Sequence, residues 1–440
     1  MNVSFAIPTI FSEQQPFMNH QLLEKRFAEL SHLLADEDLS RLSRRILDFL
    51  ADIRVPGEIK QSAIRLRANY NAYAILEKAN QTSEKRRELL SMASEVVHAI
   101  KSFLDDQPVE RKTFVPVTLE DISTDKEKTN LVFQGKQVSK TYISSKYTFK
   151  LPAIDLNLKL GEITGIVGEN GNGKTTLLRI VAGDLESTSG QIRYPRFNVA
   201  HDDWYRIKQN IAFIPQSLPV WQGFLKENLH FTAAIHGIKG AENEDRVDFI
   251  IHRLGLTKYE DALWSEISSG YKLRFELARA LVWNPGLLII DEPLANLDIN
   301  TQQVFLQDLR YLADSTQNPM SILLSSQHLH EVESIADNII FIKNGEALYN
   351  GKMADFGQDR SENLYELSTS ISKMEVQAKL AHLDSVIVED IGRHMVIHTE
   401  LNVDSNTLLG EIIGAGIPVE YFRNISTSTL KLFREGRGEN

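Results

Sequence analysis

Hydrophobic residues recur every three or four positions through most of residues 20–104, with polar residues between them. This spacing gathers the apolar side chains on one face of an α-helix, and it breaks at the acidic stretch 36–38 and at Pro56-Gly57. We therefore predict four amphipathic helices, whose apolar positions run over 22–34, 39–53, 59–76 and 89–103. Four helices of this length can close a small bundle, and we assign an all-α domain to residues 1–104.

The pattern changes after the bundle. Residues 105–130 are charged, contain prolines and keep no apolar period, which predicts a linker. From 131 to 357 short apolar runs alternate with helix-like stretches. That alternation is typical of an α/β domain, in which helices cover a mostly parallel sheet.

A smaller segment follows over residues 358–440. Its pattern predicts strands at 364–367, 385–389, 394–398 and 418–422, with helices at 373–383 and 407–415. The order strand, helix, strand, strand, helix, strand suggests a ferredoxin-like α+β domain.

Composition narrows the classes of function. The net charge of -11 argues against a chain that binds nucleic acid over its whole surface. The chain has no cysteine, so it offers no disulfide, no thiolate metal site and no thiol nucleophile. The first residues lack a positive leader with a long apolar run, and no stretch of about 18 apolar residues occurs, so we expect neither a secretory signal nor a membrane span.

A glycine-rich loop lies between an apolar run and a helix-like run at residues 168–175, Gly-Glu-Asn-Gly-Asn-Gly-Lys-Thr. Its glycines free the backbone to curl, so that N–H groups point into one anion-sized hollow at a helix start. Lys174 can then reach the β- and γ-phosphates of a nucleotide, and Thr175 can ligate Mg²⁺. A dinucleotide-binding loop needs neither this lysine nor this hydroxyl. The nucleotide-binding residues that we predict here are Gly168, Asn170, Gly171, Gly173, Lys174, Thr175 and Thr176.

Two carboxylates follow the apolar run 287–290 directly. A buried strand that ends in this way places Asp291 and Glu292 at the edge of the sheet where a doubly wound fold binds its ligands. We expect Asp291 to hold Mg²⁺ through water. Glu292 is expected to polarise the attacking water as general base, a role worth roughly 10²–10⁴ in rate. The alternative is an acidic helix cap after a strand.

Between these two motifs lies Ile267-Ser268-Ser269-Gly270-Tyr271, followed by a helical stretch at 272–282. In this order and spacing, residues 131–350 resemble the ATP-binding cassette of ABC transporters, a P-loop NTPase whose signature is Leu-Ser-Gly-Gly-Gln. The resemblance implies that two cassettes, identical or different, pair head to tail. Ser268 and Gly270 of each would close on the γ-phosphate of ATP held by the other, and hydrolysis would release the interface.

The resemblance also assigns roles to single residues. Gln216, in Ile-Pro-Gln-Ser, matches the loop whose glutamine contacts Mg²⁺ and water and signals to the membrane partner. Tyr142 matches the aromatic residue that stacks on adenine, with Tyr147 and Phe149 close by and a core aromatic as the alternative. Asp298, in Ala-Asn-Leu-Asp, matches the loop that couples the two sites of the dimer.

Two motifs depart from the family pattern. Ser269 and Tyr271 replace a glycine and a glutamine of the signature. The switch histidine falls on Gln327, with His328 one residue late. An amide can hydrogen-bond a γ-phosphate but cannot take up a positive charge as an imidazole can. We therefore expect that ATP binding is retained, that Gln327 serves as the catalytic switch residue, and that turnover is slow.

The preferred function is the ATP-hydrolysing subunit of a membrane exporter, located in the cytoplasm on the inner face of the membrane, with a separately encoded permease. Residues 416–422 and 426–433 resemble the tail of ATPases that serve ABC-2-type exporters. Residues 217–237 would form the groove for a permease helix, because Trp221 and Phe224 would be unusual on an unpartnered surface. The alternative for these two side chains is packing on the domain's own helices.

Two other functions stay open. The chain could be a soluble ABC ATPase that acts as a regulatory switch, with the helical bundle as its output domain. It could also be a cassette that binds ATP, hardly hydrolyses it and pairs with a more active partner. No nucleic-acid partner is expected in any of these cases. The sequence gives no transported substrate.

Overall fold

The computed structural model describes residues 20–53, 55–76, 81–105, 130–143, 148–197, 199–200, 203–295, 297–343, 346–356, 362–383, 386–392 and 394–426. The chain divides into two compact units: Met1–Thr164 with Asn170–Ser325 and Asn344–Glu346, and Gly165–Glu169 with Ser326–Lys343 and Ala347–Asn440. The predicted linker, apart from its two end residues, and positions 427–433 of the exporter-like tail lie outside the described residues.

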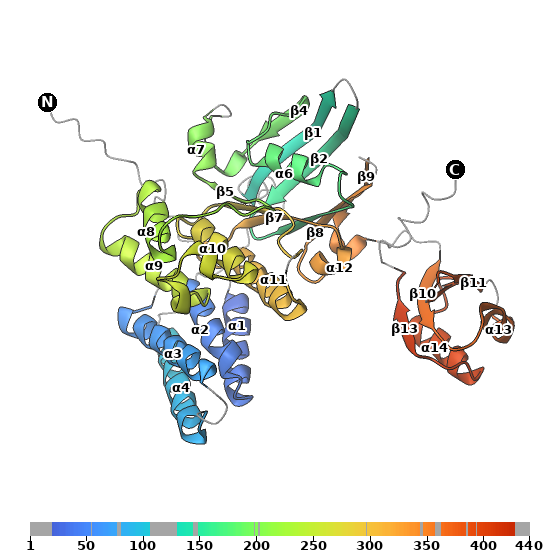
Figure 1. Ribbon diagram of the computed structural model, residues 1–440, viewed down its shortest axis with the longest axis horizontal. Coiled ribbons are helices and arrows are strands. Elements are labelled where there is room, and N and C mark those ends of the chain that lie inside the picture. Colours follow the sequence, from blue (N-terminus) through green and yellow to red (C-terminus); the bar gives the residue numbers. More distant parts are fainter. Residues whose placement is uncertain are drawn as a thin grey trace, which may run out of the picture. The chain divides into compact units, whose positions relative to one another are not determined.

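Four helices form the N-terminal part of the first unit, drawn in blue in Figure 1: α1 (His20–Ala35), α2 (Leu39–Ala51), α3 (Gly57–Ile75) and α4 (Ser83–Asp105). Their apolar faces bury Leu42, Ile46, Leu66 and Ile100 completely in one hydrophobic core. The Asp38 side chain caps α2 by accepting a hydrogen bond from a backbone N–H of its first turn, which is why the chain can turn sharply after α1.

A three-stranded antiparallel sheet of order β2-β1-β4 follows, made of β1 (Leu131–Ile143), β2 (Thr148–Lys159) and β4 (Ser189–Arg193). Along β2, buried and less buried side chains alternate, as in a strand with one face on the core. Tyr142 and Phe149 pair directly across β1 and β2.

The second sheet has six strands in the order β5-β6-β7-β3-β8-β9: β5 (Ile211–Ile214), β6 (Leu287–Ile290), β7 (Ser321–Ser326), β3 (Ile163–Val167), β8 (Asn338–Lys343) and β9 (Glu346–Lys352). The division between the units passes within β3 and β7. Neighbouring β5, β6 and β7 are parallel, and every residue of β3, β6 and β7 is buried. Parallel strands covered on both faces are buried continuously in this way.

Helices connect these strands: α6 (Lys174–Val181), α7 (Trp204–Lys208), α8 (Leu225–Ile235), α9 (Ala241–Arg253), α10 (Ser269–Leu281), α11 (Ile299–Ala313) and α12 (Leu329–Val332). Short 3-10 turns occur at Pro195–Phe197, Thr257–Tyr259, Trp264–Glu266 and Met353–Asp355. The predicted start of the helix at residue 272 is wrong. The helix begins three residues earlier, at Ser269, because Ser268 has the extended backbone of an N-cap residue.

The C-terminal part of the second unit contains β10 (Asn363–Ser368), α13 (Lys373–Lys379), β11 (Ile387–Asp390), β12 (Met395–Thr399), α14 (Ser405–Gly414) and β13 (Tyr421–Asn424). Its antiparallel sheet has the order β11-β12-β10-β13. The last strand lies at 421–424 rather than at the predicted 418–422, because its register with β10, Ser368 opposite Tyr421, fixes where pairing starts. Tyr365, Ile397 and Leu408 share the core of this part.

Candidate functional site

The glycine-rich loop connects β3 to α6, and its glycines meet different requirements. Gly173 is the N-cap of α6 and has a left-handed backbone, with φ 94°. Gly171 is also left-handed, with φ 83°. At Gly168 a Cβ atom would lie 2.2 Å from the carbonyl oxygen of Ile342, so only glycine fits there. The loop therefore needs glycine for backbone conformation at two positions and for space at the third.

Lys174, the first residue of α6, is 4% exposed, and its Nζ lies 3.0 Å from Oε1 of Glu292. The other oxygen of Glu292 accepts a hydrogen bond of 2.9 Å from Nε2 of Gln216. Gln216 is brought there because the Asp291 N–H, at the end of β6, donates to the carbonyl of Ile214 at the end of β5. The three side chains assigned to phosphate binding, general base and water positioning are thus in direct contact.

Asp291 forms a second group of contacts beside the first. Its Oδ2 accepts a hydrogen bond of 2.7 Å from the hydroxyl of Thr175, and its Oδ1 accepts one of 2.6 Å from the hydroxyl of Ser325. The Ser325 hydroxyl in turn accepts the backbone N–H of Glu292 at 2.9 Å. Sequence reasoning missed Ser325, although its position near the end of a strand that neighbours β6 could have indicated it.

Glu292 has a left-handed backbone, with φ 46°, which is uncommon for a residue with a side chain. The hydrogen bond from its N–H to Ser325 and the contacts of its carboxylate with Lys174 and Gln216 hold it there. Backbone strain that the surroundings over-determine in this way is common at functional sites.

These side chains surround a cavity of about 410 Å³, a volume in the range of small-molecule sites. Eight predicted site residues line it together with an aromatic residue, Phe149. The lining residues are Phe149, Asn170, Gly171, Gly173, Lys174, Thr175, Thr176, Gln216 and Glu292.

The predicted adenine-stacking residue, Tyr142, does not line this cavity. It is 38% exposed and its ring centre lies 6.2 Å from that of Phe149, so it is not the core aromatic of the alternative interpretation. Tyr147 lies outside the described residues. Both Tyr142 and Phe149 remain candidates for stacking on a base.

The signature residues lie apart from the cavity. Ser268 is exposed at the N-cap of α10 and makes no side-chain capping hydrogen bond, and Gly270 lies in the first turn of the helix. Neither residue lines the cavity. The departure at Tyr271 is accommodated locally, because its ring packs 4.3 Å from that of Tyr259 and under the guanidinium of Arg274.

Asp298 is the N-cap of α11 and accepts hydrogen bonds from the hydroxyl of Thr301 at 2.6 Å and from its backbone N–H at 3.0 Å. These two bonds lower the pKa of the Asp298 carboxyl. Asp298 does not line the cavity either. Asn296, in the same loop, lies outside the described residues.

Gln327 follows β7 directly, where the switch residue was predicted, and His328 is the N-cap of α12. The backbone N–H of His328 donates to the hydroxyl of Ser326 at 2.9 Å, and its ring stacks on His330. The backbone bond fixes His328 as part of the turn into α12. The role of Gln327 in catalysis stays a prediction.

The segment after Gln216 is partly covered by the domain itself. Trp221 is half-buried: its Nε1 donates to Glu276 on α10, and the guanidinium of Arg279 lies 3.6 Å from its ring centre. The expectation of a free Trp221 is therefore wrong, because a buried carboxylate on α10 needs its indole N–H and Arg279 as partners. Burial raises the pKa of Glu276.

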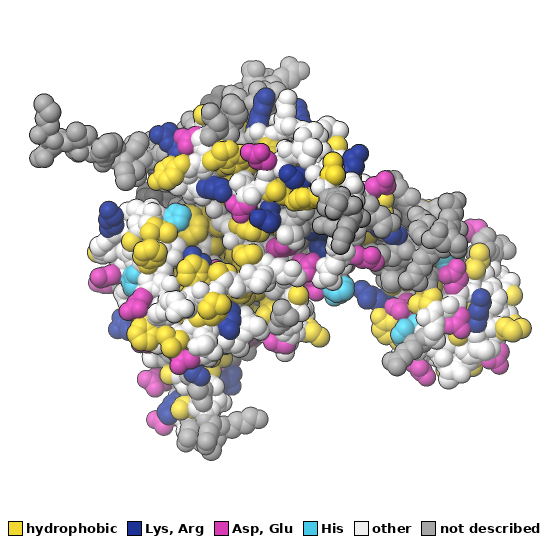
Figure 2. All heavy atoms as spheres, turned by 45° about the horizontal axis from the view of Figure 1, so that its top comes forward, with side chains coloured by type: hydrophobic (Ala, Val, Ile, Leu, Met, Phe, Trp, Pro, Cys, Tyr) yellow, Lys and Arg dark blue, Asp and Glu magenta, His cyan; other side chains and the backbone are white. Residues whose placement is uncertain are grey.

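Other apolar side chains of this segment are exposed. Figure 2 shows hydrophobic side chains, in yellow, among charged ones over the region of α8 and α9. Phe231 is 64% exposed, and the exposed large apolar residues of the segment are Val220, Phe224, Phe231 and Ile235. Within the described residues no helix is both long enough and apolar enough to cross a membrane.

Fold and site together define a nucleoside-triphosphate-binding α/β protein. A phosphate loop precedes a helix, two carboxylates follow another strand of the same sheet, and a glutamine and a serine complete the contacts around them.

Comparison with known proteins assigns the family. The family model described as "ABC transporter" matches residues 151–295. The ABC transporter ATP-binding protein NatA of Bacillus subtilis is 31% identical over 214 residues, which is 48% of this chain and 85% of that protein. The chain therefore belongs to the ATP-binding proteins of ABC transporters, as predicted, and it is an ATP hydrolase.

Further relatives are named for different transport functions. The methionine import ATP-binding protein MetN of Geobacillus kaustophilus is 30% identical over 56% of this chain and 74% of that protein. The linearmycin resistance ATP-binding protein LnrL of Bacillus subtilis is 27% identical over 59% of this chain and 83% of that protein. Among solved structures, cbiO1 from Clostridium perfringens has a TM-score of 0.47 and 25% identity, covering 52% of this chain and 92% of that chain.

The two left-handed glycines give a matched pair of variants. Gly173→Ala should weaken Mg·ATP binding by at least about tenfold, since left-handed backbone costs an alanine roughly 1–2 kcal/mol. Its Cβ would also lie 2.9 Å from Leu151 and 3.0 Å from Phe149. Gly171→Ala carries the same backbone strain but meets nothing within 4 Å, so its loss should be smaller. Isothermal titration calorimetry measures both, and equal affinities of the two variants would contradict this account of the loop.

Proposed function

We propose that this chain is the ATP-hydrolysing subunit of an ABC-type membrane exporter, which works as a head-to-tail dimer on the inner face of the membrane with a separately encoded permease. The observation that carries the proposal is the division of the predicted site. Lys174, Gln216 and Glu292 line one cavity, while Ser268 and Asp298 do not.

A nucleotide changes the partners of the buried lysine. Lys174 contacts Glu292 in the structure, and a triphosphate in the cavity offers it a stronger negative charge. Glu292 is then free to act on the attacking water as general base, while Gln216 keeps its hydrogen bond to the carboxylate or passes it to that water.

Mg²⁺ fits the residues beside the phosphate loop. Thr175, Asp291 and Gln216 offer hard oxygen donors, which this ion prefers. The described residues contain no group of three or more histidine or carboxylate side chains that could hold a metal alone. In the proposed site Thr175, Asp291 and Gln216 would hold the ion together with substrate phosphates, whose oxygens its charge would neutralise.

The position of the signature supports the proposed dimer. Ser268 is the exposed N-cap of α10, and Gly270 lies in its first turn. The start of a helix attracts an anion through its free N–H groups and its dipole. In a head-to-tail pair this helix start closes on the ATP held by the partner's phosphate loop, and Asp298 couples the two sites.

The permease groove is the exposed apolar surface of the segment after Gln216, defined by Val220, Phe224, Phe231 and Ile235. Several exposed large apolar side chains on one segment support an interaction site there. The export direction rests on the tail at residues 416–422 and on the relative named for linearmycin resistance, whereas other relatives are named for import. The soluble-switch alternative is not favoured, because these relatives are transporter proteins.

The flanking parts are proposed as separate domains: a helical bundle over 1–104, the cassette over 131–357 and a ferredoxin-like domain over 358–440. For the last, the element order and the sheet order β11-β12-β10-β13 support the assignment.

Glu292→Gln should trap an ATP-bound dimer, because the amide keeps the size of the side chain and loses the general base. Size-exclusion chromatography with Mg·ATP should show the dimer mass. The matched variant Lys174→Ala should neither bind ATP nor dimerise. A Glu292→Gln protein that binds ATP and remains monomeric would overturn the dimer.

Gln327→His should raise the steady-state ATPase rate by at least about tenfold, since an imidazole can carry positive charge near the developing negative charge and an amide cannot. His328→Gln is the control, because the structural role of His328 is its backbone bond in the turn, and it should change the rate little. An unchanged or lower rate in Gln327→His would show that Gln327 does not limit turnover.

Phe231→Glu should release the protein from washed membranes of its native host, because a charge replaces an exposed apolar contact of the groove. Tyr205→Ser is the control: Tyr205 is 76% exposed, against 64% for Phe231, but belongs to α7. Western blots of the membrane fraction and mass spectrometry of co-purified proteins test this. Membrane retention of Phe231→Glu at the level of the control, or co-purification of a soluble partner alone, would contradict the groove.

A further inference from the structure

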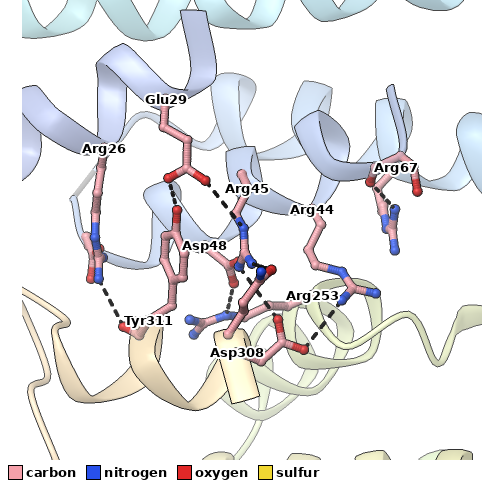
Figure 3. A network of polar contacts seen from close by, with 12 residues as sticks. Arg26, Glu29, Arg44, Arg45, Asp48, Arg67, Arg253, Asp308 and Tyr311 are labelled. Carbon is pink, nitrogen blue, oxygen red and sulfur yellow. Dashed lines mark hydrogen bonds and ion pairs between the residues drawn. The ribbon is translucent and has the colours of Figure 1, made fainter. Parts of the chain in front are cut away.

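A buried polar joint connects helix α2 to the ATP-binding part of the chain. Figure 3 shows its side chains, which converge from α1, α2, α9 and α11. On α2 the joint consists of Arg45 and Asp48, one helical turn apart, which are 5% and 4% exposed. Their mutual contact is a hydrogen-bonded ion pair of 2.7 Å between Nη1 and Oδ2.

Asp48 links this pair to α9. Its Oδ1 accepts a hydrogen bond of 2.9 Å from Nε of Arg253, the last residue of α9. Burial by itself would raise the pKa of the Asp48 carboxyl, and the charges of Arg253 and Arg45 outweigh it and lower the pKa. The carboxylate is therefore ionised and stands between two guanidinium groups from different helices.

Arg45 links the same pair to α11. Its Nη2 donates to Oε1 of Gln307 at 3.0 Å, and its Nη1 lies 3.6 Å from Oδ1 of Asp308. Its guanidinium also lies 3.9 Å from the ring centre of Tyr311, a cation–π contact. Asp308 is further paired with Arg44 at 3.5 Å.

Each of the two helices leads to a different part of the ATP machinery. The chain runs from Arg253 through two 3-10 turns to Ser268 at the start of α10, and Arg246 on α9 donates to the carbonyl of Val282 just past the end of α10. Helix α11 begins at Ile299, after its N-cap Asp298, a few residues past Glu292. The Arg45–Asp48 pair therefore connects α9, which leads to the signature helix α10, with α11, which follows the general base Glu292.

We propose that Asp48 and Arg45 are positioning residues for ATP hydrolysis, which fix α9 against α11 and so set where Ser268 stands relative to Glu292. The N-terminal bundle acts as a brace across the cassette. The inference rests on the proposed head-to-tail dimer, since Ser268 acts there on the partner's ATP. Binding of ATP to one phosphate loop does not involve α2, so the brace affects turnover and not the first binding step.

Asp48→Asn tests the brace. The amide keeps the size of the side chain but leaves Arg45 and Arg253 without their shared negative charge. We expect kcat of the ATPase to fall by at least about tenfold, while Kd for Mg·ATP stays within about twofold of wild type. A role confined to general stability would lower both binding and turnover.

A structural readout accompanies the kinetics. The chain contains no cysteine, so Glu244→Cys on α9 and Gln303→Cys on α11 give two unique, exposed labelling positions. Pulsed electron double resonance between spin labels at these positions should show a broader or shifted distance distribution in Asp48→Asn. Asp48→Glu, which retains the carboxylate, should recover most of the turnover and the wild-type distribution.

Arg41→Gln is the matched control on the same helix, because Arg41 is exposed and pairs only with Asp38, at 3.6 Å, among the described residues. It should change neither measurement. If Asp48→Asn does not fold, Arg253→Gln replaces it: this variant breaks only the α9 side and leaves Asp48 paired with Arg45.

The brace is overturned if Asp48→Asn, or Arg253→Gln in its place, folds and keeps both the wild-type kcat and the wild-type distance distribution. This conclusion requires that Glu292→Gln still forms an ATP-bound dimer. A Glu292→Gln protein that binds ATP but stays monomeric would instead refute the proposed dimer, and this inference with it.

Discussion

The buried ion pair between Lys174 and Glu292 is the contact on which the site depends. Neither charge could stay in this environment alone, because a buried charge without a partner costs several kcal/mol. The pair therefore fixes the start of α6 against the end of β6, and Gln216 joins it from β5. When a triphosphate binds, Lys174 can exchange the Glu292 carboxylate for the phosphate anion. The positive charge of the lysine is therefore balanced with and without the nucleotide.

The parallel sheet explains why these groups meet. Neighbouring parallel strands end at one edge, so the residues after β5 and β6 and those near the end of β7 are close in space although they are far apart in the chain. The hydroxyl of Ser325 shows the consequence: it bridges the backbone of Glu292 and the carboxylate of Asp291. These two residues of the β6 end are thus held by a residue of the neighbouring strand β7.

The N-terminal helices combine two kinds of interaction. Leu42, Ile46 and Leu66 form a hydrophobic core that holds the four helices together without directional preference. Their contact with α9 and α11 combines the Phe249 ring, which packs against this core, with charged side chains, chiefly Arg45 and Asp48. Replacing such groups by apolar ones can be neutral or stabilising in other proteins. Here the charged groups fix the orientation of the helices, because an ion pair with fixed hydrogen bonds admits one arrangement of them.

The sequence by itself determined what depends on neighbouring residues: the helices, the phosphate loop and the strand that ends in Asp291 and Glu292. Their signals are periodicity, glycine and short motifs, and each lies within a few residues. Only the tertiary structure showed that Trp221 donates a hydrogen bond to a carboxylate on α10, that Ser325 bonds to Asp291 and Glu292, and that Asp48 pairs with α9. These contacts join residues tens to hundreds of positions apart, and a buried polar group takes whichever partner the fold brings within hydrogen-bonding distance.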